Sequence, residues 1–508
     1  MTSWTDGYVA DIGYTHGFYR ELTPALLRFV GIAKGKRTSD LNKPSTYCEL
    51  GCGQGFSANL LAAANPHIEF CATDFNPSHI VGARALASQA GSPNVRFFDQ
   101  SFGDFVNEPS LPDFDVISLH GIYSWIAAEH RSNIVRFIRR KLKPGGIVYI
   151  SYNALPGWSA AAPLRHLMFE HGRSQGGATG SRLRLALQFM DRVLASNARY
   201  FQANAAAKDG FERLKSQNHH YLAHEYLNEA WTLLYHSDVA REMGEAKLTY
   251  LGSAALLEEL DAINLTADQQ KVVAEVIDPT FRETVRDFMV NQQFRRDVFV
   301  KGSVPLSGLE ALAGWQELRV ALSTSRTEVP LKVKGSLGDA TLRQEAYEPV
   351  LDALARGPRT VRQLLADQRV SALGFASLSE CLTVLIGAGH LQPCLNQNGD
   401  EDRSICTRAF NDAVLHRAVL SDDLAALASP VTGGGVPVDR ISQLFILAHR
   451  QKQADAAQYV WSVLEGQGQR LIRDGKTLET REDNVSELRD KFAIFSKRAD
   501  VLNQLGIT

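Results

Sequence analysis

The sequence has few cysteines, no long apolar run and almost no net charge. Its 6 cysteines among 508 residues are too sparse for a disulfide framework. Cys48 and Cys52 also have no second pair nearby that would complete a zinc site. No stretch reaches the roughly 18 apolar residues of a membrane span, and the first residues lack the pattern of a secretory signal. These absences predict a protein of the reducing cytoplasm with no membrane partner.

The charge balance excludes one class of function. Lys and Arg number 54 against 56 Asp and Glu, a net charge of −2, whereas a dedicated nucleic-acid binder carries a basic excess. We therefore expect no nucleic-acid partner. Hydrophobic residues make up 44% of the chain, which suffices for packed cores. The length suggests roughly three domains of about 150 residues each.

Short apolar runs alternate with helical patterns in the first third of the chain. Strand patterns cover residues 46–50, 68–73, 95–98, 114–119 and 147–151. Strands spaced by helices indicate a parallel sheet with helices on both of its faces. The sequence therefore predicts an α/β fold with a doubly wound, Rossmann-like core.

The core pattern is interrupted after residue 173. A glycine- and serine-rich break at 174–180 precedes a proline-free helical stretch at 181–231, which we interpret as an insertion that forms a lid or a dimer contact. Strand patterns recur at 247–251 and 294–300. These two segments are candidates for further strands of the first sheet.

The pattern changes again at Pro305. A small β region, three helices and a strand at 390–393 follow in the order of a winged-helix-like α+β region. Residues 344–395 hold four arginines and five acidic residues, 4 − 5 = −1, so we interpret the region as a scaffold or protein contact, not a DNA reader. Glycines 433–435 predict a loop, and the residues after Asp439 are predicted to be helical to the end.

The expected organisation follows from these patterns. It comprises a ligand-binding core at 1–175, a helical insertion at 176–240, returning core strands or a regulatory segment at 241–305, a winged-helix-like domain at 306–400 and a helical C-terminal domain at 401–508.

A glycine-rich loop follows the first strand and precedes the first helix. It contains Gly51, Gly53 and Gly55 directly after Glu49, and glycines let backbone N–H groups approach a ligand closely. The next strand ends at Asp74, 74 − 51 = 23 residues after Gly51, where a carboxylate can accept hydrogen bonds from a ribose diol. The spacing differs from the dinucleotide fingerprint. An acidic residue before the loop disfavours a pyrophosphate and suits a cationic cofactor, S-adenosylmethionine.

The loop and several further segments resemble a known family. The segments are 13–22, 49–55, 72–77, 119–126, 151–158, 224–228 and 294–299. They are similar to class I S-adenosylmethionine-dependent methyltransferases that carry a methyltransferase regulatory domain, a group that includes the rickettsial protein-lysine methyltransferases. The similarity covers most of residues 1–305 and, loosely, the C-terminal region. It implies S-adenosylmethionine as cofactor, S-adenosylhomocysteine as product and a protein lysine as leading acceptor.

The cofactor residues follow from the loop and from this resemblance. We expect Glu49 to face the amino group of the cofactor, Asp74 its ribose, and Phe75 its adenine. Asn76 can instead cap the following helix. The full predicted set is Glu49, Gly51, Gly53, Gly55, Asp74, Phe75, Asn76, Ser101, Phe102 and His120.

The predicted catalytic residues follow the fourth strand and the N-terminus. His120, Tyr123 and Trp125 come directly after a strand whose carboxyl end should face the ligand, and Tyr14 can close over the pocket from an N-terminal arm, together with His16 and Tyr19. Tyr152, Asn153 and Trp158 follow the fifth strand at the same rim. The pair His220 and His224 lacks a third ligand, so we expect no metal.

The acceptor decides what these residues must do. A lysine amine must lose a proton, and desolvation together with the sulfonium charge lowers its pKa. A hydroxyl acceptor would need a base, for which His120 is the candidate. The leading hypothesis is methylation of a protein lysine, with a protein substrate as partner and a possible homodimer through the helical insertion. Methylation of a glycan or natural product at oxygen or nitrogen is an alternative, and a non-catalytic scaffold that binds the cofactor is a second one.

Overall fold

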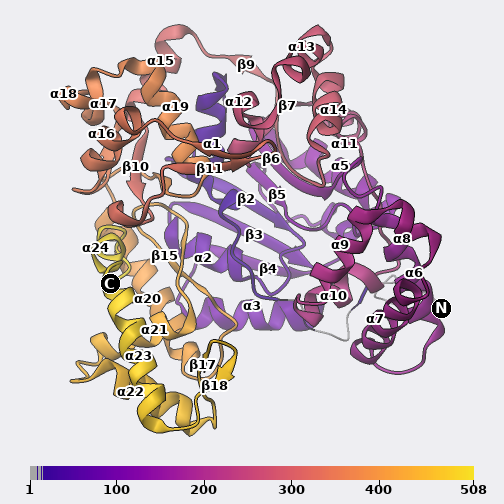
Figure 1. Cartoon of the computed structure of the whole chain (residues 1–508). Helices are drawn as coiled ribbons and strands as arrows, with labels where there is room; N and C mark the ends of the chain where they lie inside the picture. The colour runs from indigo at the N-terminus through magenta and orange to yellow at the C-terminus, as the bar shows by residue number, and fades with distance from the viewer. Residues whose placement is uncertain (1–7, 10–12, 14) are drawn as a thin grey trace.

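A seven-stranded sheet forms the centre of the molecule (Figure 1). The computed structural model describes residues 8, 9, 13 and 15–508. The strand order is β4-β3-β2-β5-β6-β8-β7. The strands are β2 (Ser45–Leu50), β3 (Ile68–Asp74), β4 (Val95–Asp99), β5 (Phe114–Leu119), β6 (Leu142–Asn153), β7 (Leu248–Ser253) and β8 (Phe294–Lys301).

The sheet is parallel over its first five strands and antiparallel at one edge. β2 to β6 pair in parallel, and β8 lies antiparallel to both β6 and β7. The predicted parallel sheet is confirmed, and so is the return of two later strands to it. The order reverses between β2 and β5, and ligands bind outside the carboxyl ends of strands at such a reversal.

Successive residues of the strands point to opposite faces of the sheet. Tyr47 and Val116 belong to one apolar core, and their neighbours Cys48 and Ile117 belong to another. The first core includes residues of α1 (Pro24–Ala33), α2 (Phe56–Ala64) and α3 (Pro77–Gln89). The second includes residues of α4 (Phe102–Phe105), α5 (Ala128–Lys141) and α11 (His236–Glu245). Because both faces are covered by helices, the sheet is doubly wound, as predicted.

The helical insertion, taken here together with the preceding helix α6, lies beside this core and has an apolar cluster of its own. Its helices are α6 (Ala162–Ser174), α7 (Thr179–Ala195), α8 (Arg199–Ala203), α9 (Ala205–Leu214) and α10 (His219–Leu227). Met168, Met190 and Phe211 pack together there, separately from the sheet. The elements between β7 and β8 are η2 (Leu256–Glu259), α12 (Asp261–Asn264), α13 (Ala267–Glu275) and α14 (Pro279–Val290).

The middle region contains a small three-stranded sheet of order β13-β10-β14, against which helices α16 and α19 pack. The predicted strand at 390–393 is β14, which pairs with β10 and leads directly to α20. The elements of this region are β9 (Val304–Pro305), α15 (Gly308–Glu317), β10 (Arg319–Leu322), η3 (Arg326–Glu328), β11 (Lys332–Gly335), β12 (Gly338–Thr341), α16 (Gln344–Leu354), β13 (Arg359–Thr360), α17 (Val361–Leu365), α18 (Gln368–Ser371), α19 (Gly374–Gly387) and β14 (Leu391–Cys394). Two short elements, η1 (Arg20–Leu22) and β1 (Lys36–Arg37), precede the central sheet in the chain.

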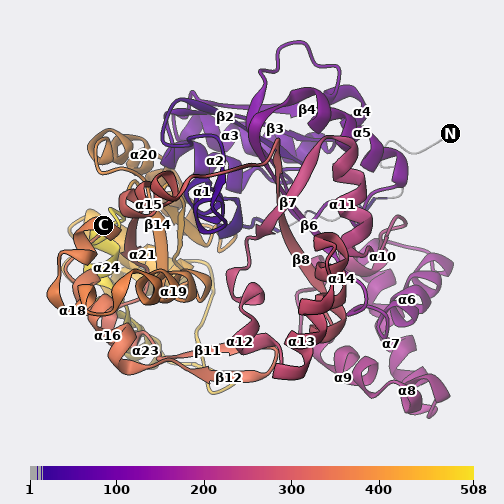
Figure 2. The same ribbon diagram turned by 90° about the horizontal axis from the view of Figure 1, so that it is seen from above.

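The C-terminal region lies on the opposite side of the sheet from α6–α11 (Figure 2). Its helix α20 packs against α2, and the apolar core of the sheet continues without a break into this region. The elements are α20 (Asp400–Ala418), β15 (Ala426–Ala428), β16 (Gly435–Pro437), α21 (Arg440–Arg450), α22 (Ala456–Gly466), β17 (Ile472–Arg473), β18 (Lys476–Thr477), α23 (Arg481–Ser496) and α24 (Ala499–Gln504). The hairpin β17–β18 corrects the prediction of an entirely helical C-terminus.

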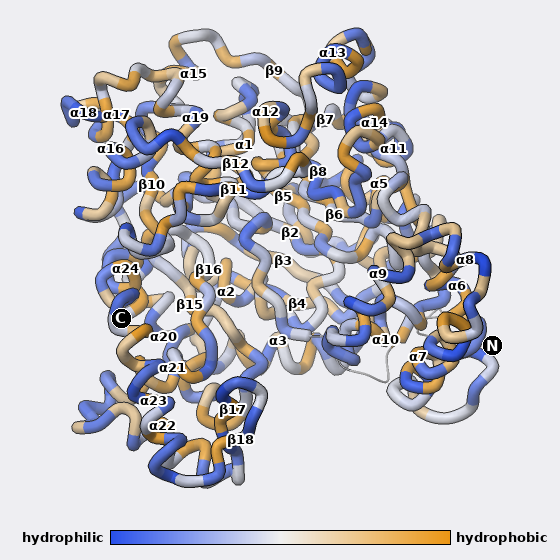
Figure 3. Tube along the Cα trace, in the orientation of Figure 1, coloured by the Kyte–Doolittle hydropathy of each residue, from blue (hydrophilic) through white to orange (hydrophobic). Residues whose placement is uncertain are grey.

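Hydropathy along the chain agrees with these layers. The outer helices alternate hydrophilic and hydrophobic residues along the tube (Figure 3), as expected of helices with one face on a core. Within the residues described, no helix is long and apolar enough to cross a bilayer.

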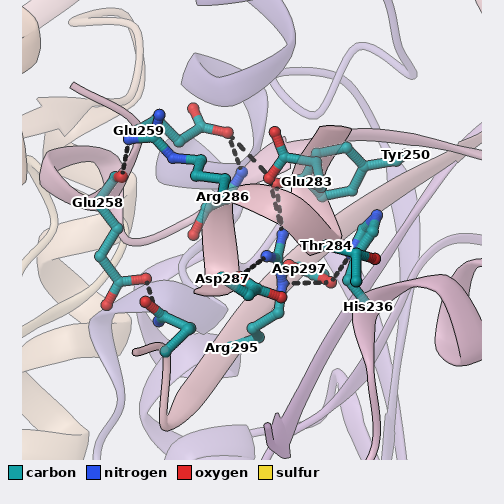
Figure 4. Close-up of polar contacts among 12 residues, drawn as sticks. His236, Tyr250, Glu258, Glu259, Glu283, Thr284, Arg286, Asp287, Arg295 and Asp297 are labelled. Carbon is teal, nitrogen blue, oxygen red and sulfur yellow. Dashed lines mark hydrogen bonds and ion pairs between the residues drawn. The ribbon is translucent and has the colours of Figure 1, made fainter. Parts of the chain in front are cut away.

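A buried arginine joins the antiparallel edge of the sheet to its covering helices (Figure 4). Arg295 on β8 donates to Asp297 Oδ1 at 2.9 Å and to Glu283 Oε2 at 3.0 Å, and it also contacts Asp287 on α14. Asp297 accepts further hydrogen bonds from Tyr152 of β6 at 2.6 Å and from His236 of α11 at 2.9 Å. Burial opposes a charge on Asp297, yet Arg295 and His236 hold its pKa at about 2.

Replacing this arginine should destabilise the sheet edge. We expect Arg295→Met to lower the free energy of unfolding by about 3–5 kcal/mol, because it leaves buried carboxylates without their counter-charge. Urea titration followed by tryptophan fluorescence measures the loss. Arg241→Met is the control: its side chain is 70% exposed, so the change should stay within about 0.5 kcal/mol. Equal stability of both variants would contradict a stabilising role for Arg295.

Candidate active site

A pocket opens at the carboxyl ends of β2, β3 and β5, where the strand order reverses. It encloses about 1260 Å³ of empty space, part of it open to solvent. The lining includes Tyr8, Thr15, Gly17, Tyr19, Glu49, Gly51, Gly53, Gln54, Ser57, Asp74, Phe75, His79, Gln100, Ser101, Phe102, His120, Ile122, Trp125, Ile126 and His130. Most residues predicted for the cofactor therefore meet in one cavity, at the position that the fold reserves for ligands.

The glycine loop between β2 and α2 forms the floor of this pocket. Gly51, Gly53 and Gly55 have φ values of +72°, +52° and +67°, a conformation that favours glycine. A Cβ atom at Gly55 would lie 2.5 Å from the Cβ of Ala83 and 2.8 Å from the ring of Phe97. Gly55 is outside the pocket lining, and the absence of a side chain there allows α2 to pack closely on its neighbours.

Asp74 lies at the end of β3 with its carboxylate over the loop. Its Oδ2 accepts a hydrogen bond from Gly53 N–H at 2.9 Å, and its Oδ1 accepts one from Asn76 N–H at 2.9 Å. His79 Nδ1 lies 3.2 Å from Oδ1. A carboxylate offers about four lone-pair sites, so Oδ2 keeps capacity for a ribose hydroxyl. Asn76 is outside the lining and caps α3 by accepting from Ser78 N–H at 3.0 Å, the alternative role that its position allowed.

Glu49 is a buried carboxylate that lines the pocket. Its side chain is 6% exposed, and Oε2 has no hydrogen-bond partner among the residues described. Burial, and then the charge of Asp74, raise the pKa of Glu49 to about 8. A buried oxygen without a partner is costly, and an amino group at this place would supply the missing donor. The residues present thus fit the amino-acid part of S-adenosylmethionine.

Aromatic and polar groups line the opposite end of the cofactor region. Phe75 and Phe102 are among them, with Ser101 between strand β4 and helix α4. The Ser101 hydroxyl also caps α4 by accepting from Asp104 N–H at 3.2 Å. Gln100 and His79 line the pocket as well, and the sequence analysis missed them. Gln100 follows a strand end, which was an available signal, whereas His79 lies inside a helix and gave none.

His120 and Trp125 mark the remaining part of the pocket. The ring of Tyr19 stacks on His120 with 3.7 Å between the centroids, and His120 Nδ1 lies 2.9 Å from the Tyr149 hydroxyl. Burial, and then the positive charge of Arg296, lower the pKa of His120 to about 3. The imidazole is therefore neutral at neutral pH and a weak base.

Other predicted residues lie away from the pocket. The ring of Tyr123 is fully buried, and its hydroxyl donates to Glu242 instead. Tyr14 falls outside the residues that the structure describes. The other three rim candidates are also buried behind the lining: Tyr152 bonds Asp297, Asn153 donates to Glu225 at 3.2 Å, and Trp158 packs on Trp231.

Two further expectations concern histidines. His16 does not line the pocket; its Nδ1 lies 3.5 Å from Asp423 Oδ2. His224 is buried on α10. Across the described part of the chain, no group of three or more His, Cys, Asp or Glu residues is arranged to hold a metal ion.

Comparisons with known proteins agree with this geometry. Residues 48–148 match the model of a methyltransferase domain, and residues 218–301 match that of a predicted methyltransferase regulatory domain. An uncharacterized protein of Synechocystis sp. is 46% identical over 507 residues, which covers 100% of both chains. An uncharacterized protein of Rickettsia prowazekii is 29% identical over 256 residues, 49% of this chain and 45% of that protein.

Solved structures share the whole fold. PKMT2 from Rickettsia typhi in complex with AdoHcy superposes with a TM-score of 0.69 at 19% identity, covering 97% of this chain and 99% of that one. A second structure of PKMT2 gives 0.71 at 18% identity, with 97% and 100% covered. At these identities the likeness shows the fold.

The sheet order, the glycine loop and Asp74 together define a class I methyltransferase with S-adenosylmethionine as its cofactor. The chain belongs to the family of such methyltransferases that carry a methyltransferase regulatory domain. The predicted family, fold and cofactor are confirmed.

Removing the charge of Asp74 should weaken cofactor binding. We expect Asp74→Asn to bind S-adenosylhomocysteine about 10- to 100-fold less tightly, because a hydrogen bond to a charged group contributes about 1.5–3 kcal/mol. Calorimetric titration measures the affinity. Asp99→Asn is the matched control, since Asp99 ends the neighbouring strand and is exposed outside the pocket. An unchanged affinity in Asp74→Asn would remove this residue from the cofactor site.

Glu49 should make cofactor affinity depend on pH. The free protein holds a proton on Glu49 below about pH 8, and that proton must leave before the carboxylate pairs with an ammonium group. Affinity for S-adenosylhomocysteine should therefore rise from about pH 6 to about pH 8, and this rise should disappear in Glu49→Gln. The exposed Glu69→Gln should keep it. A pH-independent affinity in the unaltered protein would contradict the pairing.

Proposed function

We propose that the protein methylates a lysine side chain of a protein substrate. The cofactor, when bound, supplies an electrophilic methyl group on its sulfonium sulfur. The observation that carries the choice of acceptor is the state of His120, which is neutral and a weak base with a pKa of about 3. General-base catalysis works best when the pKa of the base lies near the working pH, so His120 is poorly suited to activate a hydroxyl acceptor.

An amine acceptor needs no general base of the kind that a hydroxyl needs; it needs a desolvated site with groups that stabilise a cation, and the pocket provides both. An amine becomes a nucleophile once it loses a proton, and a desolvated site lowers its pKa. Tyr8, Tyr19 and Trp125 present aromatic rings to the cavity, and aromatic faces stabilise cations by about 0.5–2 kcal/mol. Such rings favour entry of a charged ammonium group while the apolar surroundings favour its deprotonation.

A buried carboxylate stands behind this aromatic wall. Glu225 on α10 is 5% exposed and accepts hydrogen bonds from the side chains of Asn153 and Trp125. Burial raises the pKa of Glu225 to about 7, against the opposing effects of Asn153 and of the positive charge of Arg165. Its partial negative charge at neutral pH fixes the indole of Trp125 and adds to the attraction for a cation.

The relatives support the same acceptor. The sequence resembles the rickettsial protein-lysine methyltransferases, and the described chain follows PKMT2 over nearly its whole length. A protein partner belongs to this proposal, and the helical insertion is the proposed element for a homodimer.

Isotope transfer tests the acceptor. Protein incubated with tritiated S-adenosylmethionine and a bacterial cell extract should place label in macromolecular bands that resist hydroxylamine, and mass spectrometry should map the methyl groups to lysine. Label confined to small molecules would replace the lysine proposal with the small-molecule alternative. Absence of any transfer would favour a cofactor-binding scaffold.

The pH profile of transfer gives an independent prediction. With an amine acceptor, the rate should rise between about pH 7 and about pH 9 as the acceptor loses its proton. His120→Asn should keep this profile and lose less than about tenfold in rate, as should His130→Asn, the matched change at another histidine of the lining. A loss of about 10²–10⁴-fold in His120→Asn alone would identify it as a general base.

A further inference from the structure

Residues 15–23, called the strap here, form one wall of the cofactor pocket. Thr15, Gly17 and Tyr19 all line the cavity. The Ser57 hydroxyl, in the first turn of α2, donates to Gly17 O at 2.8 Å, and Tyr19 stacks on His120. The position of the strap therefore sets the shape of the pocket beside the glycine loop.

The other side of the strap lies against α19 of the middle region and against the C-terminal region. The Arg20 guanidinium donates to the carbonyl oxygen of Ile386, near the end of α19 and 366 residues further along the chain. His16 lies 3.5 Å from Asp423, whose carboxylate is itself held by Arg417. The strap, which forms one wall of the cofactor pocket, is thus held on its other side by residues of the last quarter of the chain.

The strap packs directly on the glycine run at 433–435, which explains two of its three glycines. Only Gly433 has a positive φ, +66°, so the backbone at Gly434 and Gly435 would accept other residues. The space around them would not accept a side chain. A Cβ at Gly434 would lie 2.9 Å from Thr23 Cγ2, and one at Gly435 would lie 2.8 Å from the ring of Phe18. These two glycines leave room for the strap to lie directly on the backbone of the C-terminal region.

We propose that α19 and the C-terminal region together position the strap, and with it Tyr19, over the cofactor pocket. The contact surface consists of Ile386, Asp423, Gly434 and Gly435, called the strap seat here. None of the residues of the seat lines the pocket, so they are positioning residues that act through the strap. A change in the seat should alter how tightly the pocket holds its cofactor, whichever acceptor the enzyme uses. The proposal rests on the cofactor pocket and is independent of the lysine acceptor.

An added methyl group in the seat tests this role. We expect Gly435→Ala to bind S-adenosylhomocysteine at least about tenfold more weakly by calorimetry, since overpacking of this kind displaces neighbouring groups. Amide hydrogen exchange in residues 15–23 should become faster. Gly466→Ala is the matched control in the same region, because a Cβ there meets nothing within 4 Å, and it should change neither reading. Wild-type binding by Gly435→Ala would overturn the proposal.

A compensating change separates positioning from general damage. Phe18→Leu removes about the volume that the new methyl group adds, so Gly435→Ala with Phe18→Leu should recover binding to within about threefold of the unaltered protein. Failure to recover in a folded double variant would mean that the seat does not act through the strap, and would overturn the proposal.

A second pair of variants tests the proposal if Gly435→Ala fails to fold, which thermal melting would reveal. Arg20→Ala removes the bond to Ile386 without adding an atom and should weaken S-adenosylhomocysteine binding in the same way. Arg20→Lys, which can still donate to a carbonyl oxygen, should restore it. Unchanged binding in Arg20→Ala, or equal losses in both variants, would overturn the proposal. Since cofactor binding is measured without an acceptor, these outcomes stay distinct from failure of the lysine proposal.

Discussion

Three successive N–H groups of the glycine loop are bonded to the end of β3, and the site depends on this tie. Gly51 and Cys52 donate to Thr73 O at 2.8 and 3.0 Å, and Gly53 donates to the Asp74 carboxylate at 2.9 Å. The loop is thereby fixed to the neighbouring strand before any ligand arrives. The same bonds orient Asp74 and leave the Glu49 carboxylate facing the cavity. A preorganised site of this kind spends little of its binding energy on ordering the loop.

Charge in the free pocket is lower than its residue types suggest. Burial favours the neutral form of Glu49 and of His120 alike, raising the pKa of one and lowering that of the other. The cavity therefore pairs a carboxyl group that can ionise near neutral pH with an imidazole that stays uncharged. A cationic ligand fits this pocket, because its positive charge can pair with the ionised Glu49 carboxylate while His120 contributes no positive charge of its own.

Much of the fold and of the cofactor site could be predicted from the chain, for identifiable reasons. The parallel strands follow from periodicity, and Asp74 follows from its place at a strand end. Tyr123 and Trp125 could not be told apart, because both are aromatic residues of one turn and only packing sends the first into the core. Gly55 shows the same limit: a glycine that admits a ligand and one that admits a neighbouring helix look alike in sequence.

The C-terminal hairpin was predictable and was missed. Asp474 and Gly475 between β17 and β18 both have positive φ, +51° and +76°, and an Asp-Gly pair is a strong hairpin signal. The contacts of the strap were beyond sequence reasoning, since they join residues more than 360 positions apart. A segment as short as the strap gives no periodicity from which such a partner could be inferred.

The separate apolar cluster of the helical insertion has a consequence for how the molecule can vary. Because the apolar residues of α7 to α9 pack in a cluster separate from the sheet, these outer helices can open locally while α10 keeps Glu225 bonded to Asn153 of β6. Their surface can also diverge without cost to the packing of the central strands. The chain thus combines one continuous core, which the sheet shares with the C-terminal region, with a module whose stability is set independently. This division lets the surface of the module change while the cofactor site is retained.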